Sequence, residues 1–164
     1  MDLEILNSGR IADFYHIEED VLGEGMNKVV RGLNIKTGEE VAIKIINTKE
    51  IGPEEQNYLF KEIQILSEVS HPNIVKLLEV FEDAKGGKFY LVFELMKGGT
   101  LSEKVAESSY MQEEKAANLL LPVVDALNFC HEIGITHRDL KVRKPGVTSS
   151  LTTSSSTATT PTRA

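Results

Sequence analysis

The run Val41-Ala-Ile43-Lys44-Ile45-Ile46 places one lysine in the middle of a segment rich in β-branched residues. Such a run is typical of a strand with at least one buried face. An ammonium group that faces the core needs an ionic partner or an anionic ligand. Strand alternation would equally allow Lys44 to point to solvent. The run therefore requires a fold that contains a sheet, and it leaves Lys44 as either a surface lysine or a functional one.

Four further segments have strand-like patterns, and turn residues separate them. With the lysine-bearing run they cover residues 14–22, 29–35, 41–46, 74–81 and 89–93. The first leads into Gly23-Glu24-Gly25, and the last two are joined by a turn that contains Gly86 and Gly87. We therefore predict five antiparallel strands. Residues 1–13 have no clear period and are predicted to be a loose leader.

Helical spacing begins after the third strand, at Pro53, which suits the first position of a helix. Leu59, Ile63 and Leu66 form an apolar stripe, and Glu62 lies beside it. Two more helices are predicted at residues 101–107 and 112–132. The second contains Pro122, which should bend it, and Gly134 is a suitable residue to end it.

Charge and cysteine content exclude several classes of protein. The net charge of −7 and the pI of about 5.2 disfavour binding to nucleic acid or to a membrane surface. Cys130 is the only cysteine, so an intrachain disulfide and a thiolate metal cluster are excluded. No apolar segment approaches the length of a membrane helix, and the N-terminus lacks the pattern of a signal peptide. We expect a soluble, cytoplasmic protein.

The segment Ile135-Thr-His137-Arg138-Asp139-Leu140-Lys141 carries the groups best suited to chemistry. Asp139 could act as a general base for a hydroxyl group, and Lys141 could neutralise a phosphate. A surface ion pair would have the same composition. The segments that precede it decide between these interpretations.

The order and spacing of all these elements resemble the protein kinase catalytic domain, from its first strand to its catalytic loop. The Asp139-x-Lys141 pattern is similar to that of Ser/Thr kinases. The sequences of residues 71–75 and 129–135 resemble those of the calcium/calmodulin-dependent kinase group. The resemblance implies an α+β fold with a sheet-and-helix N-lobe and an incomplete helical C-lobe. The predicted parts are a leader (1–13), an N-lobe (14–93), a hinge (94–99), a partial C-lobe (100–141) and a disordered Ser/Thr-rich tail (142–164).

The resemblance further implies binding of ATP with Mg²⁺ and phosphoryl transfer to Ser or Thr of a protein substrate. Lys44 would hold the α- and β-phosphates and pair with Glu62, Asp139 would accept the hydroxyl proton, and Lys141 would steady the γ-phosphate. Leu22, Val30 and Ala42 would enclose adenine. The other implied nucleotide-binding residues are Gly23, Glu24, Gly25, Met26, Asn27, Lys28, Val29, the gatekeeper Phe93, and Glu94 and Met96 of the hinge. A regulatory protein partner is a further possibility.

Several positions depart from the family pattern. Lys28 stands where counting places the third glycine, and Thr100 stands where many members have an acid. Lys144 occupies the position of the Mg²⁺-binding asparagine, and the sequence contains no Asp-Phe-Gly, so the expected metal ligands are missing. We therefore expect weak activity or none. The alternatives are a non-catalytic, pseudokinase-like binding module, or a truncated gene or splice product that does not fold.

Overall fold

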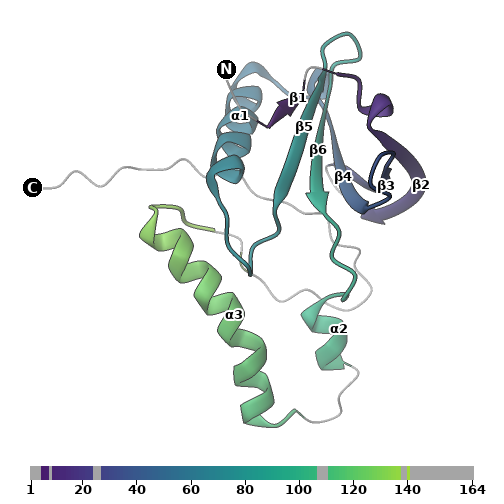
Figure 1. The fold of residues 1–164 in the computed structure, drawn as a ribbon. Helices are drawn as coiled ribbons and strands as arrows, with labels where there is room; N and C mark the ends of the chain where they lie inside the picture. Colours follow the sequence, from purple (N-terminus) through teal and green to yellow (C-terminus); the bar gives the residue numbers. More distant parts are fainter. Residues whose placement is uncertain (1–4, 8, 24–26, 107–110, 138–139, 141–164) are drawn as a thin grey trace, which may run out of the picture.

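The computed structural model describes residues 5–7, 9–23, 27–106, 111–137 and 140 (Figure 1). Its strands are β1 (Leu6–Asn7), β2 (Tyr15–Gly23), β3 (Lys28–Asn34), β4 (Glu40–Asn47), β5 (Leu77–Asp83) and β6 (Lys88–Glu94). Its α-helices are α1 (Pro53–Glu68), α2 (Leu101–Ala106) and α3 (Glu113–Glu132). Two short 3-10 helices are η1 (Ile11–Asp13) and η2 (Thr48–Glu50). No described helix is both long enough and apolar enough to cross a membrane.

The strands form one sheet in the order β1-β5-β6-β4-β3-β2. All neighbouring pairs are antiparallel except β1, which runs parallel to β5. The predicted α+β fold of a kinase-like N-lobe with part of a C-lobe is confirmed, with one strand more than the predicted five. The predicted loose leader differs from the structure at β1, because a two-residue strand is too short to show a period in the sequence.

The sheet is buried on both faces. On one face α1 contributes Leu59 and Ile63 to a cluster centred on strands β4, β5 and β6. On the other face, residues of η1 and the start of β2 cover a second cluster that contains Ile43 and Phe81. The strands β2 and β3 curve at one edge of the sheet (Figure 1), and they contribute Tyr15 and Val30 to this second cluster. Four consecutive residues of β4, from Val41 to Lys44, are consequently buried.

Helix α1 begins as its sequence predicts. Pro53 is its first residue, and the Glu55 carboxylate accepts a hydrogen bond from the Gly52 amide at 2.7 Å. This bond satisfies the backbone donor just before the helix and places negative charge at the positive end of the helix dipole. The stripe of Leu59 and Ile63 then turns inward, and Glu62 lies between them on the same side.

Helix α3 ends at Glu132, and Gly134, the residue predicted to end it, forms the cap that follows. Gly134 has a positive φ of 79° and its amide donates to the His131 carbonyl, while the Ile135 amide donates to Cys130. These two bonds form a Schellman cap, which needs a residue that tolerates the left-handed conformation. The helix continues through Pro122. Leu120, Leu121 and Val124 of this helix are exposed.

Gly32 of β3 lies directly above Ile43, which is completely buried, and a methyl group added at Gly32 would overlap the Ile43 side chain. We predict that Gly32→Ala destabilises the fold by about 1–3 kcal/mol because a packed core cannot absorb the extra atom. Urea unfolding measures this loss. Gly98→Ala is the matched control, because no atom lies within 4 Å of its added methyl group. Equal stability of both variants would contradict the packing described here.

Candidate functional site

The centre of the candidate site is an ion pair between β4 and α1. Lys44 is 4% exposed, which excludes the surface orientation that strand alternation would have allowed. Its Nζ lies 3.6 Å from Oε1 of Glu62, whose side chain is 14% exposed. At this distance the contact is an ion pair without a hydrogen bond, and Oε1 has no hydrogen-bond partner within the part of the chain that the structure describes. The predicted partnership of Lys44 with Glu62 is present in the structure.

The Glu62 carboxyl group is held in an environment that disfavours its charge. Burial raises its pKa above the ordinary value of 4.5, and the positive charge of Lys44 opposes this rise without cancelling it. The two buried groups therefore leave part of their electrostatic requirement unmet. An additional polar or anionic group next to Lys44 would be attracted to its ammonium.

The face of the sheet that carries Lys44 also carries three small or apolar predicted nucleotide-binding residues. Val29 lies opposite Lys44 in the β3–β4 register, and Phe93 of β6 lies opposite Ala42. All three belong to the cluster that α1 covers, and Leu22 packs against that cluster. These side chains therefore share one surface with the ion pair.

Val30 lies elsewhere. It is opposite Ile43 and belongs to the second cluster, on the other face of the sheet. Val30 therefore does not share a face with Lys44, and Val29 holds the position beside it. The physical reason is register: successive residues of a strand point to opposite faces, so an error of one position reverses the assignment.

The glycine-rich connection itself is only partly described. Gly23 ends β2 opposite Val29, and Lys28 begins β3, with an exposed side chain. Asn27 precedes it in a bend. Glu24, Gly25 and Met26 lie outside the described residues.

The predicted hinge follows β6. The Glu94 amide donates to the Lys76 carbonyl at 3.1 Å, and its carboxylate accepts from the Lys76 amide at 2.7 Å. Any adenine contact of Glu94 would therefore use its carbonyl group. Met96 is exposed. Lys97 pairs with Glu40 of β4, and this hydrogen bond, with that from Arg31, lowers the pKa of the Glu40 carboxyl group.

Thr100 has a structural role that the sequence interpretation missed. Its hydroxyl oxygen accepts from the Glu103 amide at 3.2 Å, and the Glu103 carboxylate accepts from the Thr100 amide at 2.7 Å. This reciprocal pair is a capping box, and its Thr-x-x-Glu signal is visible in the sequence. The position is therefore used to start α2, and the hydrogen bonds of Glu103 lower the pKa of its carboxyl group.

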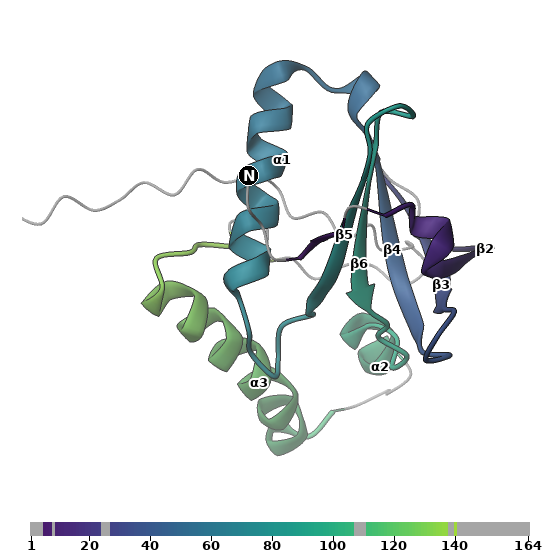
Figure 2. The same cartoon turned by 45° about the horizontal axis from the view of Figure 1, so that its top comes forward.

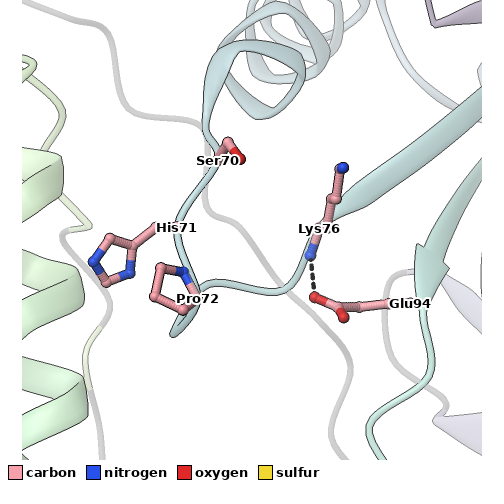
Figure 3. A pocket seen from close by; sticks show the side chains of 5 residues that line it. All are labelled: Ser70, His71, Pro72, Lys76 and Glu94. Carbon is pink, nitrogen blue, oxygen red and sulfur yellow. Dashed lines mark hydrogen bonds between the residues drawn. The ribbon is translucent and has the colours of Figure 1, made fainter.

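The loop between α1 and β5 connects the sheet to α3. Asn73 donates to the Asp125 carboxylate at 3.0 Å, and His71 Nε2 lies 3.3 Å from the same oxygen. The His71 ring also lies against Phe129, with 4.9 Å between ring centroids. Figure 3 shows His71 turned toward α3, at one side of a pocket of about 290 Å³. The other residues that line this pocket are Ser70, Pro72, Lys76 and Glu94. These contacts place α3, and hence the segment after it, relative to the N-lobe.

The predicted catalytic segment follows the cap of α3. Ile135, Thr136, His137 and Leu140 are described, whereas Asp139 and Lys141 lie outside the described residues. Among the residues that the structure describes, no group of three or more His, Cys, Asp or Glu side chains is arranged to hold a metal ion.

Comparison with known proteins identifies the family to which this geometry corresponds. The protein kinase domain model matches residues 15–143. The chain belongs to the protein kinase domain family. The match begins at β2 and includes the Lys44–Glu62 pair, the hinge and the segment that contains Asp139.

Individual relatives agree with this family. The chain is 39% identical over 141 residues to calcium-dependent protein kinase 5 of Plasmodium falciparum, an alignment that covers 85% of this chain and 24% of that protein. It is 40% identical over 132 residues to myosin light chain kinase A of Dictyostelium discoideum, covering 80% of this chain and 44% of that protein. The predicted resemblance to the calcium/calmodulin-dependent group is confirmed. The chain spans less than half the length of each of these relatives.

The raised pKa of Glu62 has a consequence for stability. Between its unfolded value near 4.5 and the higher folded value, the folded state binds more protons than the unfolded state, so stability falls as pH rises through this window. Glutamine is neutral at every pH. We therefore predict that the stability of the wild type relative to Glu62→Gln decreases as pH rises from 4.5 toward neutrality.

Urea unfolding of both proteins across this pH range provides the measurement. Glu68→Gln, which makes the same chemical change at an exposed position at the end of the same helix, is the matched control. A wild type that gains stability over Glu62→Gln as pH rises would contradict the stated balance between burial and the charge of Lys44.

Proposed function

We propose that this chain is the ATP-binding part of a protein serine/threonine kinase catalytic domain. The observation that carries the proposal is the buried Lys44 ammonium, whose one carboxylate partner among the described residues, Glu62, lies 3.6 Å away. Burying a charge is costly unless strong partners surround it. A buried, incompletely satisfied ammonium beside a glycine-rich connection is suited to an anionic ligand such as the phosphates of a nucleotide.

The proposed adenine site consists of apolar groups on the same face of the sheet. Leu22, Val29 and Ala42 would contact the ring, and Phe93 would limit the depth of the site. The carbonyl of Glu94 and the backbone of Met96 would supply the polar contacts. Because the apolar residues are already packed around Lys44 by the sheet register, little reorganisation would be needed for binding.

In the proposed reaction, Asp139 orients the hydroxyl group of a protein serine or threonine and accepts its proton. Lys141 would offset negative charge on the transferred phosphoryl group. Glu62 keeps Lys44 in place for the remaining phosphates. ATP supplies the phosphoryl group, and the chain supplies position and charge.

The residues of this chain do not fit the two-magnesium arrangement of the family. Lys144 stands where counting from Asp139 places the asparagine ligand, and an ammonium has no lone pair for a cation. We propose that the 164-residue chain by itself transfers phosphate weakly or not at all.

Partners and location are further parts of the proposal. The names of the relatives, a calcium-dependent protein kinase and a myosin light chain kinase, support a protein substrate and a regulatory protein partner. The single cysteine and the acidic composition support a reducing, cytoplasmic environment without nucleic-acid or membrane binding.

The first experiment measures ATP binding by thermal shift. Saturation at 100 times the dissociation constant should add about 2.7 kcal/mol to the stability of the wild type. Lys44→Met should reduce ATP affinity about tenfold or more, because a charge-assisted contact to phosphate is lost. Lys61→Met makes the same change on the exposed side of α1 and should leave affinity unchanged. Equal ATP affinity of all three proteins would overturn the proposed site.

The second experiment measures phosphoryl transfer with labelled Mg-ATP and a general protein substrate. We predict negligible turnover by the chain alone, because Lys144 replaces a metal ligand. Turnover near the ordinary kinase range of about 1–100 per second, abolished by Asp139→Asn, would contradict the predicted inactivity and support the proposed roles at the same time.

Lys144 also favours a second candidate function, a nucleotide-binding module without catalysis. The thermal-shift experiment distinguishes the two when it is repeated without Mg²⁺. Stabilisation by ATP that does not depend on the metal supports the binding module. Stabilisation that requires Mg²⁺ supports a catalytic domain.

A further inference from the structure

The N-terminal residues form an ordered segment that crosses the sheet. We call residues 5–7 and 9–14 the N-terminal strap. At one end, β1 lies beside β5, with Leu6 opposite Val80, and the Ile5 carbonyl accepts from the Val80 amide at 2.8 Å. At the other end the chain enters β2. Since β1 and β2 are the two opposite edges of the sheet, the strap passes over the face that carries the second cluster.

Specific contacts hold the strap along this path. The Asn7 side chain accepts from the Gly9 amide at 2.9 Å, and Gly9 lies so close to the Phe14 ring that a methyl group there would overlap it. Ile11 is buried in the second cluster, and the Phe14 ring packs on Phe81 of β5 at 5.4 Å between centroids. The strap is therefore held by the core packing of Ile11 and Phe14 as well as by the pairing of β1 with β5.

The β1 end of the strap lies beside the helix that carries Glu62. Figures 1 and 2 both show β1 between α1 and β5. Ile5 and Leu6 pack against the cluster that contains Leu59 and Ile63, which are the two buried residues of α1. These two residues flank Glu62 on the same side of the helix. Ile5 and Leu6 of the strap thus extend the apolar cluster to which α1 contributes Leu59 and Ile63.

We propose that the N-terminal strap positions α1 and thereby holds Glu62 next to Lys44, with Ile5 and Leu6 as the positioning residues. The helix is 16 residues long but has only two buried side chains, so removal of part of its apolar support should let it shift. The β1–β5 pairing involves two residues of β1, which makes the support weak enough to be released. The expected effect on nucleotide affinity rests on the proposed function.

The test compares three full-length variants with the wild type. Ile5→Ala with Leu6→Ala removes the support for α1, and Ile5→Val with Leu6→Ile should restore it. Ile17→Ala truncates a partly buried residue of the second cluster and controls for a general loss of stability. The measurements are hydrogen exchange of the Val80 amide, the reaction rate of Lys44 with a small amine-directed reagent, and the dissociation constant for ATP.

In the double-alanine variant we expect the Val80 amide to lose its protection from hydrogen exchange. The rate of Lys44 labelling should rise about fivefold, and ATP affinity should fall by a similar factor, because a modest coupling between two sites has this size. The conservative variant should behave like the wild type, and Ile17→Ala should leave Lys44 labelling unchanged. Lost protection at Val80 with unchanged Lys44 labelling would overturn the proposal. Circular dichroism identifies a variant that has unfolded, and Leu6→Ala alone then takes its place in the comparison.

Failure of the proposed function would look different. If neither the wild type nor any variant binds ATP, the nucleotide site is wrong, while Lys44 labelling still decides whether the strap holds the ion pair. If ATP binds to the wild type and to the double-alanine variant with the same affinity, and Lys44 labelling is also unchanged, the strap has no role at the site.

Discussion

The structure depends on the burial of one ammonium group. Lys44 lies on a strand whose neighbours are apolar, and its charge requires that α1 bring a carboxylate to it. Leu59 and Ile63 secure the helix, and the Glu62 carboxylate beside them gives up hydration to reach Lys44. The helix, the sheet face and the ion pair are therefore parts of one arrangement, and a change in the position of one alters the contacts of the other two.

Much of this arrangement could be predicted from the sequence because it has local signals. The strand pattern around Lys44, the Pro53 start of α1 and the Gly134 end of α3 each follow from the properties of single residues or short periods. Glu62 was found because helical spacing places it beside the apolar stripe. The pairing of Lys44 with Glu62 followed from the need of a buried charge for a partner.

Other features depend on information that short patterns do not contain. The β1 strand pairs with a segment more than 70 positions away, and two residues cannot show a period. Whether Val29 or Val30 lies beside Lys44 depends on the register of β3 with β4, which a short sequence pattern does not contain. Many family members have an acid at the position of Thr100, and this difference obscured the capping signal that Thr100 and Glu103 form in the sequence. The roles of Asp139 and Lys141 remain predictions.

The burial of β4 on both faces has a consequence for how sequences of this kind can vary. In an ordinary surface strand, every second position faces water and can accept many residue types. Here Val41, Ala42, Ile43 and Lys44 are all enclosed, two toward α1 and two toward the curled part of the sheet. Neither set can drift independently, because each change in volume on one side is transmitted through the backbone to the other. The strand should therefore show uniform constraint along its length, with no period of two.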